Sequence, residues 1–496
     1  MQLLQGFVTI SDPHVFLLMA VGVFGGLIVG ALPGLSAFTA LAIMLPFTFG
    51  MDSVTGLTFL VAVYVGGCSG GLISAILLGI PGTPASIATC FDGYPMAQQG
   101  KSRTALGAGI ISSFVGGIFG AVVLSFLGPY IAKVALKLSP YDYFGIILLA
   151  LTTVSSLAGD NIVKGLIACL LGICLSCVGT DGLSSVYRYT FGITKLANGF
   201  QLVPVLIGLF AVSQIMGNAR DKANQKALDF SNTDRSAGER FTFREYFQRI
   251  RMIIPVSLMG LVIGILPGLG GNISNLMAYS YAQRTSKDPE SFGKGNVDGV
   301  IASETANNAT VGGAMIILLT LGIPGDNATS VILAGFQMND IAPGPLLFKT
   351  QAHLVYAILA AFIVANVMFF LMEYFGLPIF IKMLSIPSMM LYPIVIVCCF
   401  VGSYCANNNV LDILIMVIFG VVGYIMKKYK YPLAPMVVGF ILAPMLELYL
   451  RRSLMKTDGQ WMPIMTSPVA AVCIVGTVAT IGWTVYSRVK EAKQKA

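Results

Sequence analysis

Long stretches without Asp, Glu, Lys or Arg are the feature that most restricts how this chain can fold. Two of the longest extend over Pro13–Met51 and Ser53–Phe91. A helix needs about 20 mostly apolar residues to cross a bilayer, so we expect about 12 to 14 membrane elements in the chain. Barrel strands alternate apolar and polar residues, whereas these runs are continuously apolar. The sequence therefore predicts an all-α polytopic membrane protein.

The composition supports a membrane protein and argues against a nucleic-acid partner. Hydrophobic residues make up 56% of the chain and charged residues only 10%, where a soluble domain carries about 25%. The formal charge of +8 comes partly from basic clusters at Lys427–Lys430, Arg451–Arg452 and Arg488–Lys495. In membrane proteins such clusters set the topology and lie on the cytoplasmic side. Arg451 and Arg452 fit this scheme less well, because they fall on the outer side in the expected topology.

A polar, basic loop near the middle of the chain divides it into two membrane halves. We interpret residues 220–251 as a cytoplasmic linker between an N-terminal membrane repeat, residues 1–219, and a C-terminal membrane repeat, residues 252–450. Residues 451–496 then form a terminal membrane helix and a basic tail.

The two halves repeat the same short motifs in the same order. The pairs are Gly30–Leu35 with Gly264–Leu269, Gly79–Gly82 with Gly322–Gly325, Leu138–Pro140 with Leu384–Pro387, and Ala158–Asn161 with Cys405–Asn408. Four matches in register indicate an internal duplication. We count seven apolar elements before the linker, and an odd number would invert the second half relative to the first, as in many secondary transporters. The loops at residues 40–55 and 285–297 should then face opposite sides of the membrane.

The Pro-Gly motifs are the candidate transport site. Proline removes a backbone donor and glycine permits left-handed dihedrals, so both interrupt helices. Irregular backbone at membrane depth is tolerated only where it is buried in protein or lines a wet cavity. We therefore expect broken helices or re-entrant hairpins, followed by small polar residues. The candidate substrate- or ion-binding residues are Pro33, Gly34, Ser36, Thr39, Pro81, Gly82, Thr83, Ser86, Pro267, Gly268, Asn272, Asn275, Pro324, Gly325, Asp326, Asn327, Thr329 and Ser330.

Broken helices can hold both an anion and a cation. Their free N–H groups point toward anions and their free C=O groups toward cations. Hydroxyl and amide oxygens suit hard cations such as Na⁺. The motifs contain no Arg or Lys, so helix N-termini and polar side chains must balance a bound carboxylate. The alternative is that the motifs are only kinks or tight turns at the membrane surface.

Two acids at membrane depth are candidate coupling groups, Glu304 and Asp326. Ionisable groups in membranes are costly and often functional, although an acid near a helix N-terminus can simply cap it. No enzyme site is expected: Pro95 stands where a P-loop ending at Gly100–Ser102 would need its first glycine. We expect no cofactor, and no metal beyond a transported Na⁺.

The motifs resemble those of a known family. The segments 30–36, 79–100, 264–275 and 322–345 are similar to the large membrane subunit, TctA, of tripartite tricarboxylate transporters, and the similarity extends over about residues 10 to 450. The resemblance implies a bacterial inner membrane protein that works with a small TctB-type membrane subunit and a TctC-type periplasmic solute-binding protein. It implies import of a carboxylate, citrate-like tricarboxylates among them, driven by Na⁺ or H⁺.

The resemblance and the residues together favour a secondary active symporter, with an elevator motion preferred over rocking. The sequence leaves open whether the protein forms a homodimer. The rival interpretations are a passive channel for small anions, since polar hairpin tips also occur in filters, and a membrane-embedded enzyme.

Overall fold

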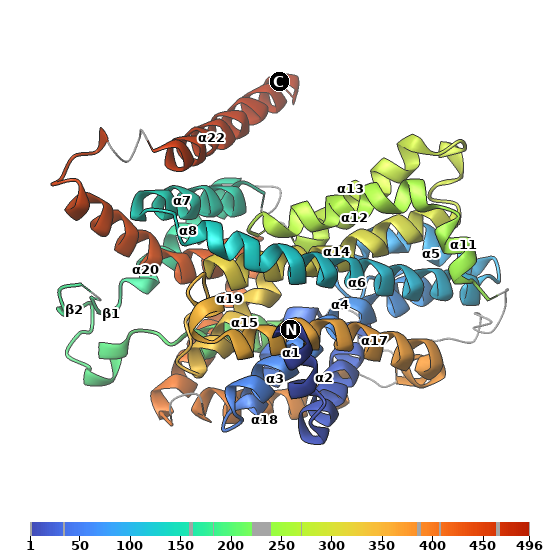
Figure 1. Cartoon of the computed structure of the whole chain (residues 1–496), viewed down its shortest axis with the longest axis horizontal. Coiled ribbons are helices and arrows are strands. Elements are labelled where there is room, and N and C mark those ends of the chain that lie inside the picture. Colours follow the sequence, from blue (N-terminus) through green and yellow to red (C-terminus); the bar gives the residue numbers. More distant parts are fainter. Residues whose placement is uncertain are drawn as a thin grey trace.

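The computed structural model describes residues 2–32, 35–157, 162–181, 183–220, 240–268, 270–383, 388–405, 408–462 and 467–495. These residues are almost entirely helical (Figure 1). One short antiparallel pairing joins β1 (Gly179–Thr180) to β2 (Tyr187–Arg188). The prediction of an all-α protein is confirmed.

The first half combines long apolar helices with short helices at chain breaks. In order they are α1 (Gln2–Ile10), α2 (Pro13–Ala31), α3 (Ala37–Met44), η1 (Leu45–Thr48), α4 (Ser53–Leu78), η2 (Pro84–Ser86), α5 (Ile87–Gln98), α6 (Ser102–Ala135), α7 (Pro140–Leu157), α8 (Ile162–Ser176), η3 (Thr194–Asn198), α9 (Leu202–Leu206), the π-helix η4 (Ile207–Val212) and α10 (Ser213–Arg220).

The second half follows the same plan. Its helices are α11 (Phe243–Phe247), α12 (Ile250–Ile265), α13 (Gly270–Thr285), η6 (Pro289–Ser291), α14 (Val297–Leu321), α15 (Asn327–Met338), α16 (Leu347–Thr350), α17 (Ala352–Met383), α18 (Ser388–Cys405), α19 (Val410–Lys428), α20 (Leu433–Lys456) and α22 (Pro468–Lys495). The expected domain boundary at residue 450 falls within α20.

Six helices among the described residues are long and apolar enough to cross a membrane: α2, α4, α6, α17, α19 and α20. Shorter apolar helices, such as Ile250–Ile265, accompany them. Large apolar side chains on these helices face outward; Phe126 on α6 is 78% exposed and Phe375 on α17 is 72% exposed. Such exposure suits hydrocarbon and would be a liability in water. The chain is a multi-pass membrane protein, and the six long helices account for part of the 12 to 14 elements expected.

Glycine lets the central helices approach closely. A Cβ on Gly26 of α2 would lie 2.4 Å from the Val63 carbonyl oxygen of α4. In the second half, a Cβ on Gly264 of α12 would lie 2.2 Å from the Thr310 carbonyl oxygen of α14. Small residues at helix interfaces permit this packing in membranes. The helix pairs α2–α4 and α12–α14 thus repeat the same contact.

The long helices run in defined relative directions. Gly116 and Gly120 of α6 face Thr305 and Ala309 of α14, so these two helices are parallel. They lie side by side across the centre of Figure 1. Phe114 of α6 packs on Phe370 of α17 with ring centroids 4.7 Å apart, and a Cβ on Gly117 would meet Asn366. Sequence numbers therefore rise on α6 as they fall on α17, and these two helices are antiparallel.

Both breaks after the central helices have the same local geometry. Helix α4 ends at Gly79 with φ 65° and ψ 16°, and α14 ends at Gly322 with φ 73° and ψ 16°. Glycine adopts this left-handed conformation without the steric cost of a Cβ. The chain then folds back, so that Gly82 packs on the Gly30 carbonyl oxygen and Gly325 on that of Gly264. The prediction of broken helices is confirmed at these positions.

The described end of the expected linker is part of the folded structure. Residues 221–239 lie outside the described residues. Thr242 and Glu245 form a capping box that starts α11. The Tyr246 hydroxyl lies 2.8 Å from Oγ1 of Thr305, and Arg249 pairs with Asp298. The linker end is therefore attached to α14.

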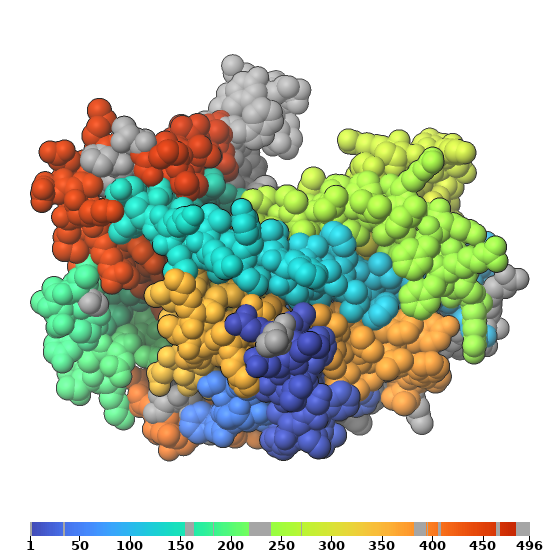
Figure 2. All heavy atoms as spheres, in the orientation of Figure 1, coloured from blue at the N-terminus to red at the C-terminus, as the bar shows by residue number. Residues whose placement is uncertain are grey.

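The N-terminal helix α1 packs on the surface of α17. A Cβ on Gly6 would collide with the Tyr356 carbonyl oxygen at 2.1 Å. In Figure 2, α1 (dark blue) lies against the orange surface of α17. The first helix of the expected N-terminal repeat thus packs on a helix from the middle of the expected C-terminal repeat.

Candidate functional site

A cavity of about 750 Å³ lies where the four helix breaks meet. Candidate residues from both halves line it: Ser36, Thr39, Pro81, Gly82, Thr83, Gly268, Asn272, Asp326 and Asn327. These positions are up to about 290 residues apart in sequence, and the fold brings them to one site. Pro33 and Gly34 lie outside the described residues.

Other candidates are packed behind the cavity rather than lining it. The Ser86 and Thr83 hydroxyls are 3.1 Å apart, and the Asn275 side chain donates to the Ala85 carbonyl. The remaining candidates outside the cavity lining are Pro267, Glu304, Pro324, Gly325, Thr329 and Ser330. Thr329 and Ser330 are buried in the first turn of α15. These residues lie at or beside the breaks without lining the cavity.

Four helices begin at the cavity. Their lining residues near the N-terminus are Ala37 of α3, Ile87 of α5, Gly270 of α13 and Asn327 of α15. The first N–H groups of a helix have no partner within the helix, and the dipole places partial positive charge there. Converging N-termini from two halves make a setting for an anion.

Asp326 connects the two halves within this cavity. It caps α15, accepting from the backbone N–H of Thr329 at 2.8 Å. Its second oxygen, Oδ2, accepts from the hydroxyl of Tyr64 on α4 at 2.5 Å. Both residues line the cavity. Asp326 therefore caps α15, one of the two roles that the sequence left open, and also joins the two halves. Its role as a coupling group stays a prediction.

Lys427, which is not among the candidates predicted from the sequence, also lines the cavity. It lies at the end of α19, and its Nζ donates to Oε1 of Gln214 at 2.6 Å. Gln214 lines the same cavity. Lys427 belongs to the basic cluster at 427–430, which was interpreted as a topology signal. Only the packing of α19 against α10 places this cation beside the helix breaks.

Glu304 is fully buried one helical turn from the cavity. Oε1 accepts from Thr89 of α5 at 2.5 Å and Oε2 accepts from Ser113 of α6 at 3.0 Å. Both donors come from the first half, while Glu304 lies on α14. Asn307, the next residue but two on the same helix, lines the cavity. Glu304 is thus hydrogen-bonded through both carboxylate oxygens near the cavity, without lining it.

Comparison with known proteins identifies the family. Residues 16–438 match the Tripartite tricarboxylate transporter TctA family. The chain belongs to this family. It is 33% identical over 496 residues to an uncharacterized 52.8 kDa protein in the TAR-I ttuC′ 3′ region of Agrobacterium vitis, covering 99% of this chain and 97% of that protein.

A second relative matches part of the TctA-family chain. It is an uncharacterized protein in the TAR-II ttuC′ 3′ region of Agrobacterium vitis, 34% identical over 223 residues, covering 45% of this chain and 92% of that protein. Family membership makes the chain a membrane subunit of a tripartite transporter system, whose general plan includes TctB- and TctC-type partners.

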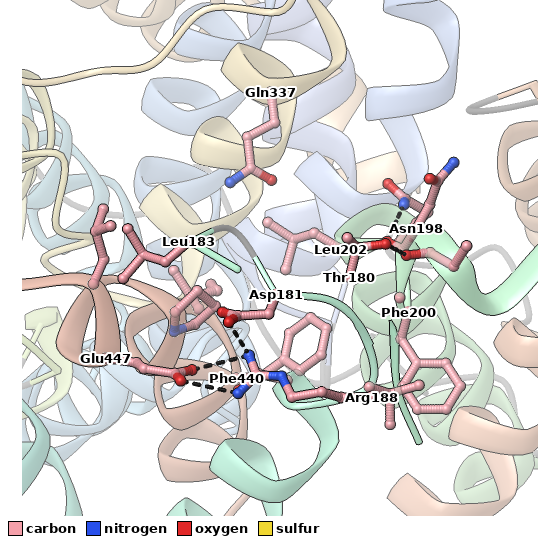
Figure 3. A pocket seen from close by; sticks show the side chains of 18 of the residues that line it. Thr180, Asp181, Leu183, Arg188, Asn198, Phe200, Leu202, Gln337, Phe440 and Glu447 are labelled. Atoms are coloured by element: carbon pink, nitrogen blue, oxygen red, sulfur yellow. Dashed lines mark hydrogen bonds and ion pairs between the residues drawn. The ribbon is translucent and has the colours of Figure 1, made fainter. Parts of the chain in front are cut away.

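The TctA-family protein has a second cavity of about 650 Å³, shown in Figure 3. None of the sequence-selected candidates lines it. Arg188 makes two contacts with Glu447, at 2.9 and 3.1 Å, and Arg451 donates to Asp181 at 2.8 Å. These ion pairs tie the β1–β2 segment to α20. Arg451, which fits the expected topology less well than the other basic residues, is paired with Asp181 here.

Asp181 lies outside the membrane helices, in the segment after α8. Donation from the Ser184 hydroxyl and then from Arg451 holds the pKa of the Asp181 carboxyl well below its usual range. Hydrogen bonds to an ionised carboxyl favour the charged form. Charged side chains at the second cavity are thus paired with one another. The central cavity is instead lined by residues at helix N-termini.

Proposed function

We propose that this TctA-family protein is the large permease subunit that imports a di- or tricarboxylate by secondary active transport. The substrate would be delivered by a TctC-type periplasmic binding protein. The location would be a bacterial inner membrane, with a TctB-type subunit beside the permease. The proposal extends family membership to a substrate class and an energy source.

The convergence of four helix N-termini on one cavity carries this proposal. Partial positive charge at α3, α5, α13 and α15 would balance substrate carboxylates. Lys427 adds a full positive charge, and Asp326 is partly neutralised as a helix cap by its donors Tyr64 and Thr329. Hydroxyls of Ser36 and Thr83 supply further hydrogen bonds. A compact, multiply charged carboxylate suits this arrangement better than a cation or an apolar solute.

We also infer that the two halves are inverted repeats. Helices α6 and α17 follow the matched breaks in their own halves, and they run antiparallel. Helix α5 is antiparallel to α14, because Thr89 contacts Ser303 while Asp92 contacts Gly299. Cysteines introduced by Phe49→Cys and Glu290→Cys, in a background without native cysteines, should be labelled from opposite sides. Labelling from one side would refute the inversion.

An elevator motion is the form of transport that we favour. The paired breaks pack together through Gly268, whose N–H donates to the Gly325 carbonyl at 2.7 Å. Asn275 of α13 and Ala85 of η2 join the second half to the first in the same region. A unit held by such contacts would move as one body past α17. Cross-linking that unit to α17 should stop uptake while leaving substrate binding intact.

Uptake into proteoliposomes tests the function directly. The purified permease, with its TctB- and TctC-type partners, would be given a panel of labelled di- and tricarboxylates under imposed Na⁺ or H⁺ gradients. Accumulation that depends on a gradient and on the binding protein supports the carrier. Downhill flux indifferent to both would instead identify a passive anion channel.

Two substitutions test whether the breaks form the site. Asn327→Ala removes an amide from the cavity lining, and Ser86→Ala removes the hydroxyl that meets Thr83. Both should impair uptake with expression unchanged. Ser125→Ala is the matched control, because the hydrogen bond that its hydroxyl makes among the described residues stays within α6, to the Ala121 carbonyl at 2.8 Å. Normal uptake in both test variants would show that these residues only shape turns.

The coupling ion would act near Glu304 and Asp326. Their oxygens, with the hydroxyls of Thr89 and Ser113, suit either Na⁺ or a proton. Glu304→Gln should uncouple accumulation from the ion gradient. The gradient that drives the unmodified protein but not the variant identifies the ion. Molar mass in detergent would decide between a monomer and a homodimer.

A further inference from the structure

Glu373 is a carboxyl in α17 for which the proposed site has no role so far. It is 0% exposed. Among the described residues, neither Oε1 nor Oε2 of Glu373 has a hydrogen-bond partner. An ionised carboxylate buried without donors is among the most costly groups in a protein, so such a group takes up a proton instead. Glu373 is therefore a neutral acid in this conformation.

The surroundings place Glu373 beside Glu304. Ser113 of α6 donates to Glu304 Oε2, and the next residue, Phe114, packs on Phe370 of α17. Phe370 precedes Glu373 by one helical turn. Phe370 also packs against the rings of Phe243 and Tyr374. These aromatic rings give this turn of α17 apolar neighbours.

The packing of α6 on α14 and α17 makes Glu304 a neighbouring carboxyl of Glu373. Two neighbouring carboxylates in an apolar setting cannot both be ionised without a large energetic cost. Glu304 has donors in Thr89 and Ser113 that stabilise its charged form, and Glu373 has none. The proton shared by this pair therefore resides on Glu373.

We propose that Glu373 is the proton-binding site of this transporter, coupled through the charge of Glu304 to the occupancy of the central cavity. This rests on the proposed transport function and names H⁺ as its coupling ion. A proton binds to a Glu373 carboxylate oxygen, forming an O–H bond and neutralising the group. When a conformational change brings water to Glu373, that O–H bond breaks, the electron pair stays on Glu373, and the proton passes to water.

The path to the cavity is short and continuous along α14. Glu304 lies one turn from Asn307, and Asn307 lines the cavity. Substrate charge at the cavity changes the field at Glu304, and Glu304 changes the field at Glu373. Binding of an anion in the cavity would thus favour a protonated acid pair, which is the sign required for symport of H⁺ with a carboxylate.

Transport by Glu373→Gln tests the proposal, because glutamine keeps the size of a neutral acid but cannot release a proton. We expect accumulation driven by a pH gradient, without Na⁺ or membrane potential, to fall at least tenfold. Carboxylate exchange at equal pH on both sides should stay within about twofold of the unmodified protein. Asp412→Asn removes another buried acid, in the first turn of α19, and should retain pH-driven accumulation.

Other outcomes separate the two proposals. Full pH-driven accumulation by Glu373→Gln, or equal loss of exchange and accumulation, would overturn the role of Glu373. Accumulation by the unmodified protein under a Na⁺ gradient alone would overturn proton coupling and leave the carrier function standing. No accumulation under any gradient would instead refute the carrier.

Chemical labelling gives a readout that does not depend on transport. Dicyclohexylcarbodiimide reacts with protonated carboxyls in apolar surroundings. Peptide mapping should find Glu373 modified at neutral pH, with modification falling as the pH is raised, and Glu304 modified less. An unreactive Glu373 in folded protein at neutral pH would overturn the proposal.

Discussion

The hydroxyl of Tyr64 donates a 2.5 Å hydrogen bond to Oδ2 of Asp326, joining α4 of the first half to the N-terminus of α15 in the second. Tyr64 is buried, and both residues line the central cavity. This contact fixes one helix N-terminus relative to the opposite half. The contact therefore both stabilises the packing of the two halves and positions the N-terminus of α15 at the cavity.

Tyr64→Phe should lower both the thermal stability of the protein and its uptake of substrate. Loss of a hydrogen bond to a charged, partly buried group costs about 1–3 kcal/mol, which thermal unfolding in detergent would measure. Uptake should fall because Asp326 loses a donor at the cavity. Tyr246→Phe is the control: it loses a bond of 2.8 Å to Thr305, and neither residue lines the cavity. It should lower stability while leaving KM unchanged; the same KM in Tyr64→Phe would contradict the prediction.

Gly82→Ala and Gly325→Ala should each disrupt a break. A Cβ added at Gly82 would lie 2.5 Å from the carbonyl oxygen of Gly30, and one added at Gly325 would lie 2.5 Å from the Cα of Ala314. Backbone at that distance must shift, and overpacking costs about 1–3 kcal/mol. We expect lower thermal stability and little uptake. Among the described residues, no atom lies within 4 Å of a Cβ added at Gly217, so Gly217→Ala should behave as the unmodified protein.

Lys427→Gln should weaken carboxylate binding by roughly tenfold, which corresponds to about 1.4 kcal/mol. The variant keeps a polar side chain near Gln214 but removes the positive charge from the cavity. Lys428→Gln changes the adjacent lysine, which does not line the cavity, and should bind normally. Equal affinities in the two variants, measured by calorimetry with the panel carboxylates, would remove Lys427 from the site.

Acid should loosen the β1–β2 segment. The pKa of Asp181 is depressed in the folded protein, first by Ser184 and then by Arg451. Its stabilising effect is thus complete above the unfolded pKa of about 3.9 and declines as the pH falls below it. Hydrogen exchange in this segment, corrected for the intrinsic pH dependence of amide exchange, should rise as the pH falls from about 4 toward about 2. Asp181→Asn should show fast exchange in this segment at every pH. Exchange that does not change with pH in the unmodified protein would contradict this prediction.

The sequence by itself determined the class of protein and the local breaks. Long charge-free runs require helices in a membrane, because backbone groups in hydrocarbon must bond within their own segment. Gly79 and Gly322 end their helices in the left-handed conformation for a reason that is also local. These features depend on neighbours in the chain, so pattern alone is sufficient to predict them.

Tertiary structure decided which residues meet. Ser86 and Asn275 follow breaks just as Thr83 and Asn272 do, yet packing turns the first pair away from the cavity and the second pair into it. Side-chain direction at a break depends on which helix packs beside it. No pattern within either motif distinguishes the two cases.

The charged residues show the same limit. Lys427 looks like a topology signal when it is seen within its own apolar run, and nothing in the run around Glu373 shows that its carboxyl is buried. The contact of α19 with α10 places Lys427 at the cavity, and the packing of α17 on α6 buries Glu373 beside Glu304. The free energy of a charge depends on its three-dimensional surroundings, which segments far apart in sequence supply.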